Sequence, residues 1–182
     1  MIWLIPVFSL VLAMLLFTSM VAGESGIRLP SIEGKALTGD KFAAPGDLTK
    51  PYNILLIAFL REQQEDIDTW LPRLEKLEDT DQGIAVYEFP ILPEMNPVTR
   101  WFIYQGMRGG IPSERARSRT VTFHLDKERF RNALKIGTED SIQVFLADSS
   151  GTVIWREAGV WSEAKQREMM SFIRPQEKPG AP

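Results

Sequence analysis

The sequence contains no cysteine at any of its 182 positions. Disulfide exchange and thiol-based peroxide reduction both need a thiolate, so neither activity is open to this chain. Histidine is almost as scarce, since His124 is the only one. A single imidazole with no cysteine or second histidine beside it rarely holds a metal ion, so we expect a structural or surface role for His124. We find no Gly-rich phosphate loop and no serine nucleophile elbow, and we expect neither a metal nor a cofactor.

An excess of positive charge is missing as well. The formal net charge is −3 at pH 7, so the field of the whole chain does not favour a polyanion, and we expect no nucleic-acid partner. The hydrophobic share of 44% and the charged share of 25% are ordinary globular values. The length suits a single domain.

Charged side chains are absent from residues 2–23, which are rich in Leu, Val, Met and Phe. About 20 apolar residues are enough to span a bilayer as a helix, so residues 1–23 could form a membrane anchor. The alternative is a cleaved signal peptide, with small residues at 21–23 as the processing site. Either way we expect the rest of the chain to be exported or anchored outside the cytoplasm, most simply in the periplasm or cell envelope.

Hydrophobic patterning predicts alternating strands and helices. The run Asn53 to Leu60 is almost entirely apolar, which is typical of a strand buried on both faces of a sheet. Apolar residues then recur at helical spacing between Ile67 and Leu77. The remaining expected elements are an extended opening segment near 29–37, strands at 84–89, 121–125, 142–147 and 152–156, and helices at 97–106, near 112–114, at 127–134 and at 162–173.

This order of elements resembles the thioredoxin-like fold, so we predict an α/β domain with a central mixed sheet flanked by helices. The domain would cover residues 24–173, with an insertion near 93–120, an N-terminal apolar helix before it and a flexible tail at 174–182. The first two core strands would be parallel and joined by a helix, and a closing hairpin with its helix would form the second half.

In thioredoxin-like enzymes the nucleophile stands just after the first core strand, at the start of the next helix. Residues 61–66 occupy that place here and offer no redox nucleophile. Glu62 and Asp66 could form a carboxylate pair for acid–base work, but a solvated helix start explains them better. The fold's cis-proline, before the third core strand, is also missing, because residues 139–141 are Glu-Asp-Ser.

The insertion combines aromatic side chains with arginines, a pairing typical of protein interfaces and anionic surfaces. It could equally be an ordinary insertion whose arginines pair with Glu114 and other acids. As candidate partner-binding residues we select those of the insertion together with one tryptophan of the closing hairpin: Arg100, Trp101, Arg108, Arg115, Arg117 and Trp155.

Short motifs also resemble the mitochondrial ATP synthase assembly-factor family. They are Leu29-Pro30 with Gly34-Lys35, Met95-Asn96-Pro97 with Trp101, the stretch Arg108 to Arg115, Phe145 to Asp148, and Val153 to Arg156 with Gly159. The resemblance implies a thioredoxin-like fold without redox activity, associated with a membrane and assisting a membrane subunit of ATP synthase.

We therefore expect a non-catalytic, membrane-proximal protein that binds or chaperones another protein, with a membrane protein as one candidate. Two other classes remain open. One is an enzyme that uses Glu62, Asp66 or His124 without thiols, or a degenerate redox-family protein of the cell envelope. The other is a structural accessory domain of an envelope complex.

Overall fold

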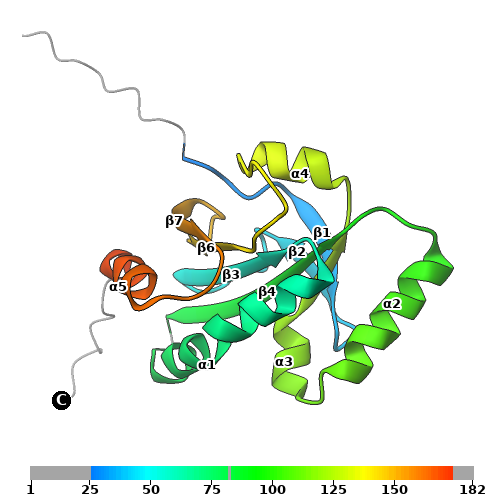
Figure 1. Cartoon of the computed structure of the whole chain (residues 1–182), viewed down its shortest axis with the longest axis horizontal. Coiled ribbons are helices and arrows are strands. Elements are labelled where there is room, and N and C mark those ends of the chain that lie inside the picture. Colours follow the sequence, from blue (N-terminus) through cyan, green and yellow to red (C-terminus); the bar gives the residue numbers. More distant parts are fainter. Residues whose placement is uncertain (1–25, 82, 174–182) are drawn as a thin grey trace, which may run out of the picture.

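A computed structural model describes residues 26–81 and 83–173 and shows a seven-stranded mixed sheet with helices on both faces (Figure 1). The strand order is β2-β1-β5-β4-β3-β6-β7. The strands are β1 (Ile32–Ala36), β2 (Lys41–Ala44), β3 (Tyr52–Ala58), β4 (Ile84–Leu92), β5 (Val121–His124), β6 (Gln143–Ala147) and β7 (Val153–Ala158). The predicted α/β class with a central mixed sheet is confirmed.

Two hydrophobic layers lie against the two faces of the sheet. On one face, α4 (Lys127–Ala133) contributes Phe130 to a cluster with Phe89, Phe123 and Phe145. On the other face, α1 (Gln64–Thr80) and α5 (Glu163–Phe172) pack Trp70 and Met169 against the central strands. The insertion contributes α2 (Pro97–Gly110) and α3 (Glu114–Arg119), and a short 3-10 turn, η1 (Arg61–Gln63), precedes α1.

The predicted core pairing is confirmed. β3 lies next to β4 in parallel, with α1 as the crossover, and next to β6 in antiparallel orientation. Residues 53–58 of β3 are buried on both faces, as the unbroken apolar run requires. The predicted hairpin of β6 and β7 is also confirmed, and Ser162 caps the start of α5 by accepting from the Lys165 N–H.

The opening segment is the main difference from the prediction. It forms a hairpin rather than a single extended stretch, because β2 folds back on β1 after the turn at Gly39 and Asp40. β1 then pairs with β5, so the hairpin extends the sheet by two strands beyond the core. Gly39 has a φ of 113°, which favours glycine at this tight reversal.

The predicted leader, residues 1–23, and the predicted tail, residues 174–182, lie outside the described residues. Within the described part of the chain, no helix is both long and apolar enough to cross a bilayer.

Candidate functional site

Gln63 lies in residues 61–66, the stretch in which the resemblance to thioredoxin-like enzymes places a nucleophile. Its side chain is buried, and its Oε1 accepts hydrogen bonds from the backbone N–H of Phe59 (2.8 Å) and of Leu60 (3.2 Å). Its Nε2 donates to the carbonyl of Glu139 at 2.5 Å. One amide therefore joins the end of β3 to the loop that precedes β6, which are the two places where the catalytic parts of the fold would stand.

The loop around Glu139 is held from its other side by α4. The Glu139 carboxylate pairs with Lys127 and with Arg131, and Lys127 also donates to the Phe59 carbonyl at 3.3 Å. The peptide bonds of this loop are trans, as its lack of proline predicts, and the cis peptide bond of the described chain joins Ala44 to Pro45. The region is a closed hydrogen-bonded cluster.

Glu62 and Asp66 fall on different elements, since Glu62 lies in η1 and Asp66 in the first turn of α1. Glu62 is exposed and Asp66 is half-buried. In residues 26–81 and 83–173, no three His, Asp or Glu side chains come together as metal ligands would. This end of the described molecule presents no arrangement that favours acid–base chemistry.

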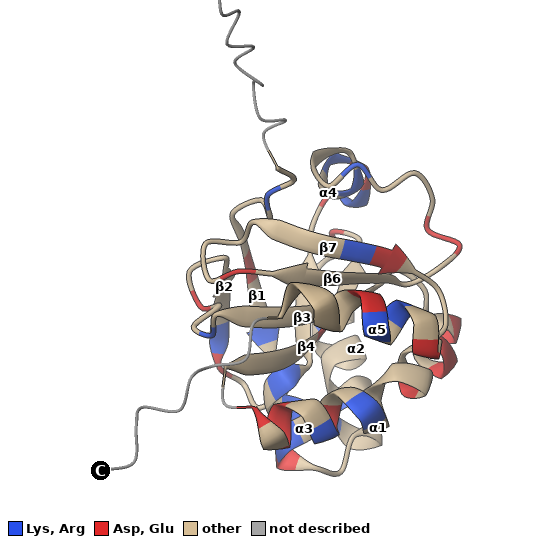
Figure 2. Cartoon of the chain, turned by 90° about the vertical axis from the view of Figure 1, so that its left-hand side faces the viewer, with Lys and Arg blue, Asp and Glu red and all other residues tan. Residues whose placement is uncertain are grey.

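Most of the insertion's arginines bind within the molecule. On α3, Arg115 pairs with Glu78 and Asp79 of α1, both at 2.7 Å, and Arg119 pairs with Glu75 at 2.5 Å. Figure 2 shows acidic and basic residues close together where α1 and α3 meet. These pairs fasten α3 to α1 and leave little of their charge for a partner. Arg117 is half-buried, and its Nε donates to the Ile111 carbonyl at 2.6 Å.

Arg119 also reaches a buried carboxylate. Its Nε donates to Glu88 of β4 at 3.2 Å, and both side chains are less than a tenth exposed. Burial raises the pKa of Glu88 above its ordinary value, and the Arg119 guanidinium acts in the opposite direction. The pair is a structural bridge between α3, β4 and α1.

Trp155 lies inside the core rather than on a surface. It is 6% exposed, stands opposite Leu146 in the β6–β7 ladder and belongs to the cluster under α1 and α5. Its indole is therefore not accessible to a protein partner in this structure.

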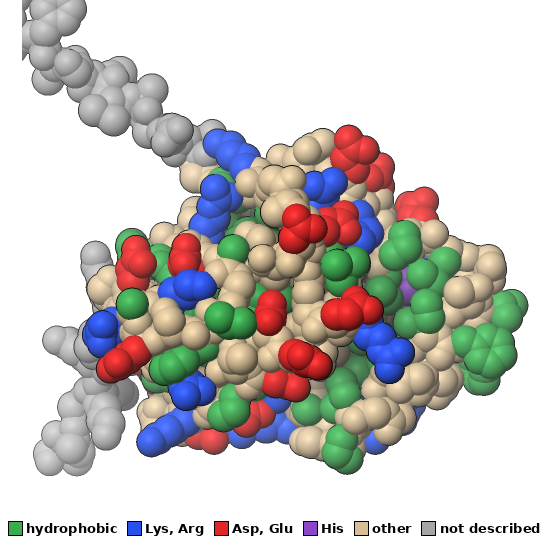
Figure 3. All heavy atoms as spheres, in the orientation of Figure 1, with side chains coloured by type: hydrophobic (Ala, Val, Ile, Leu, Met, Phe, Trp, Pro, Cys, Tyr) green, Lys and Arg blue, Asp and Glu red, His purple; other side chains and the backbone are tan. Residues whose placement is uncertain are grey.

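The other helix of the insertion, α2, projects from the body. Asn96 caps its start by accepting from the Thr99 N–H at 2.9 Å, and Pro97 takes the first position, as predicted. None of its residues is buried, and Val98, Trp101 and Phe102 are 65%, 56% and 64% exposed. Every other described α-helix buries at least one side chain. Hydrophobic side chains protrude on the right-hand side in Figure 3, the side that carries α2.

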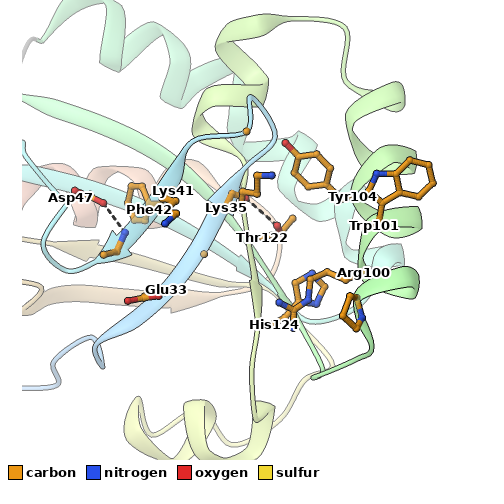
Figure 4. A pocket seen from close by; sticks show the side chains of 14 residues that line it. Glu33, Lys35, Lys41, Phe42, Asp47, Arg100, Trp101, Tyr104, Thr122 and His124 are labelled. Atoms are coloured by element: carbon orange, nitrogen blue, oxygen red, sulfur yellow. Dashed lines mark hydrogen bonds between the residues drawn. The ribbon is translucent and has the colours of Figure 1, made fainter.

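Tyr104 ties α2 to the sheet. Its hydroxyl donates to the Ala36 carbonyl at 3.1 Å, and the ammonium of Lys35 lies 4.9 Å from the centre of its ring. Figure 4 shows Tyr104 pointing from α2 towards the hairpin of β1 and β2.

Between α2 and the sheet lies a groove of about 710 Å³, which we call the α2 groove. Its floor is formed by β2, β1 and β5, and α2 is its wall (Figure 4). The charged and aromatic residues that line it include Glu33, Lys35, Lys41 and Asp47 from the opening hairpin and its following loop, His124 from β5, and Arg100, Trp101 and Tyr104 from α2.

His124 stands at the junction of the floor and the wall. Its partial burial, together with the Arg100 guanidinium, lowers its pKa, although the nearby Pro93 carbonyl acts in the opposite direction. At neutral pH the imidazole is therefore uncharged. The positive charge of the α2 groove comes from Lys35, Lys41 and Arg100.

Of the six predicted site residues, the structure brings only Arg100 and Trp101 to the α2 groove. Arg108 lies further along α2, exposed. The sequence analysis did not select Lys35 and Lys41 of the groove floor. The Gly39-Asp40 pair between them is typical of a turn, and a hairpin closed there places the two lysines opposite each other.

No protein family model matches the sequence, and no curated protein matches it. Solved structures match its fold. A protein from Aquifex aeolicus VF5 named for electron transfer aligns with a TM-score of 0.58 at 14% identity, over 81% of this chain and 94% of that chain. A thiol-disulfide oxidoreductase from Bacteroides fragilis aligns with a TM-score of 0.53 at 13% identity, over 80% and 99%. BsSco, a member of the Sco family of cytochrome c oxidase assembly proteins, gives 0.54 at 10%, over 81% and 92%.

These likenesses define the class: the chain has a thioredoxin-like fold. Because it has no cysteine, it lacks the group that the thiol-disulfide chemistry of such neighbours requires. The comparisons do not support the resemblance to ATP synthase assembly factors, which stays a prediction from short motifs.

Proposed function

We propose that this chain is a non-catalytic protein-binding module that holds a protein partner on α2. The supporting observation is the exposed apolar surface of Val98, Trp101 and Phe102 on a helix that buries none of its own side chains. Exposed aromatic side chains next to arginine are enriched at the centres of protein interfaces. Arg100 and Arg108 of the same helix are exposed, and no ion pair within the described chain engages them.

The closed cluster around Gln63 supports a binding role over catalysis. In the stretch that would carry a nucleophile, the side-chain amide of Gln63 forms hydrogen bonds with backbone groups. An interface needs a different kind of surface, apolar and exposed, and α2 supplies it at the opposite edge of the sheet from β7.

The partner that we propose is a membrane protein, and the action on it is assistance in assembly. Two observations support this finer statement: the sequence motifs shared with ATP synthase assembly factors, and the fold likeness to BsSco, whose family is named for the assembly of cytochrome c oxidase. The apolar residues 1–23 would bring the domain to the membrane from the periplasm or cell envelope.

Site-specific crosslinking in cells tests the proposal. The photoreactive p-benzoylphenylalanine replaces Phe102 in the full chain, and in a control it replaces Phe172, a 42% exposed residue of α5. We expect a discrete crosslinked product at position 102 that sediments with membranes and contains a membrane protein. The product should fall about tenfold or more with Trp101→Ala, because truncation of an aromatic hot spot removes most of its binding energy.

The control at position 172 should give no such product. The absence of any product at 102, or the same products at both positions, would overturn the proposal. A Trp101→Ala chain with an unchanged unfolding midpoint would show that lost crosslinking is not lost folding, since an exposed side chain contributes little to stability.

A further inference from the structure

The α2 groove carries positive charge that the molecule does not neutralise. Lys35, Lys41 and Arg100 are exposed, and in the described chain none of them forms an ion pair. Elsewhere on the same molecule, Arg115, Arg119 and Lys127 each have a carboxylate partner. Three cations without an ion-pair partner around one concave surface favour electrostatic recognition of an acidic ligand.

The two acids of the groove, Glu33 and Asp47, offset part of this charge. The Asp47 carboxylate also has a backbone partner, because its Oδ2 accepts from the Ala43 N–H at 2.6 Å. The groove therefore presents three cations against two carboxylates, which leaves an excess of positive charge.

Aromatic rings line the same groove. Trp101 and Tyr104 stand on the wall, and Trp101 is 56% exposed. A ligand that satisfies the whole surface must place carboxylates near Lys35, Lys41 and Arg100 and an apolar side chain against Trp101 (Figure 4). A volume of about 710 Å³ is within the usual range of ligand-binding clefts, so it suits a short peptide segment.

The edge of the sheet indicates how such a segment would bind. β2 is the edge strand, and a peptide could in principle extend the sheet there. However, Asp47 occupies both outward backbone groups of Ala43, since its side chain accepts from the Ala43 N–H and its own N–H donates to the Ala43 carbonyl at 2.8 Å. The edge is therefore blocked at Ala43, which favours a ligand that contacts the face of the sheet through side chains.

We propose that the α2 groove binds an acidic segment of the protein partner, in which carboxylates lie close to a large apolar side chain. This inference rests on the proposed function and specifies the chemistry of the partner. A membrane surface rich in anionic lipid is the competing source of negative charge. A flat bilayer suits this site less well, because Lys35 and Lys41 lie on the floor of a concave surface behind α2.

Fluorescence anisotropy tests the groove directly. The probe is a fluorescein-labelled heptapeptide in which Glu alternates with Leu and Phe, and the control peptide has Gln in place of every Glu. We expect the acidic peptide to bind and the Gln peptide to bind at least about tenfold more weakly. The double substitution Lys35→Gln and Arg100→Gln should reduce the affinity for the acidic peptide about tenfold or more.

A matched control removes the same charge elsewhere. The double substitution Lys76→Gln and Arg129→Gln changes two exposed cations on α1 and α4, outside the α2 groove. It should leave the peptide affinity within about twofold, because charges beyond a Debye length are screened. Equal effects of the two double variants would overturn the inference, since they would show attraction by net charge alone.

Vesicles of phosphatidylglycerol test the competing ligand, an anionic lipid surface. We expect no binding of the chain to them that depends on Lys35 and Arg100. Groove-dependent binding to vesicles would overturn the inference in favour of a lipid ligand.

The two proposals fail in different ways. Crosslinking at position 102 that persists unchanged in the Lys35→Gln and Arg100→Gln variant would overturn the acidic-segment inference and leave the partner-binding function standing. Loss of crosslinking in that variant, with a retained unfolding midpoint, supports both. Peptide binding without any crosslinked partner in cells would overturn the proposed function alone.

Discussion

The two helices of the insertion, α2 and α3, follow each other in the chain and use their arginines in opposite ways. On α3, Arg115 and Arg119 are paired with carboxylates of α1 and β4. On α2, Arg100 and Arg108 face solvent, and the helix is attached to the sheet through Tyr104. The difference lies in what stands opposite each helix, since α3 faces a row of acids on α1 and α2 faces the lysines of the opening hairpin.

Length explains why α3 depends on these ion pairs. α3 has six residues, and helices this short are not stable alone in water. Its cap at Ser113 and its ion pairs with α1 therefore stabilise it. α2 has 14 residues, which is still marginal for an isolated helix, and its capped start and the contacts of Tyr104 hold it while its apolar side chains stay exposed.

Removing the buried arginine of α3 is expected to have the largest effect. In Arg119→Met the carboxylate of Glu88 stays buried, at 4% side-chain exposure, without its cation. Breaking a buried pair in this way costs about 3–5 kcal/mol, so we expect the free energy of unfolding to fall by that amount at pH 7. Urea denaturation measures it. A loss below about 1 kcal/mol would show that Glu88 does not need Arg119.

The same variant has a predictable pH dependence. Burial already raises the pKa of Glu88 above the ordinary 4.5, and loss of Arg119 raises it further. A folded-state pKa above the unfolded one means that the folded protein binds the proton more tightly, so stability rises as pH falls through that window. We expect Arg119→Met to be least destabilised near pH 4.5 and most destabilised above the raised pKa. Adding Glu88→Gln should remove this dependence.

The tether of α2 is expected to contribute less. Tyr104→Phe deletes the hydroxyl that donates to the Ala36 carbonyl, which also accepts from the Gly39 N–H and so keeps a partner. We expect a loss of about 1 kcal/mol in the docking of α2 and almost none in global unfolding. Hydrogen exchange of the backbone amides at 97–110 should accelerate about fivefold, while β3 amides stay unchanged. Equal acceleration of β3 would contradict the idea that α2 opens on its own.

The exposed ion pairs of α3 are expected to matter least. Arg115 is 49% exposed at its side chain, and surface pairs of this kind contribute about 0.5 kcal/mol. We expect Arg115→Ala to lower the unfolding free energy by about that amount at low ionic strength and by less in about 1 M salt, where screening is strong. A larger loss of unfolding free energy that does not change with salt concentration would indicate that the aliphatic stem of Arg115 contributes by packing.

Local signals predicted most of the fold. The unbroken apolar run of β3, the helical spacing around Trp70 in α1, and Asn96-Pro97 at the start of α2 each act within a few residues. β2 was missed because Lys41–Ala44 is four residues long and mixes polar with apolar side chains. Its formation depends on pairing with β1, which is a tertiary contact.

The candidate site was harder to predict, because charge partners come from distant parts of the chain. Arg115 pairs with acids 37 and 36 positions away, and the alternative of arginines that pair with Glu114 and other acids did not identify them. The α2 groove is hard to predict for the same reason, because Arg100 and Lys35 are far apart in the chain and both line it. Composition alone could indicate that arginines and aromatics gather in residues 95–120, and only the topology shows which arginines stay free.

The burial of Gln63 limits how a redox enzyme could be designed on this scaffold. The Gln63 side chain is 5% exposed, so a thiol introduced at this position would start buried, out of reach of most oxidants and of a second protein's disulfide. The substitution would also release the loop at Glu139, which the amide now holds. A redox design would therefore require an opening of this loop as well as an added sulfur, so one substitution would not be enough.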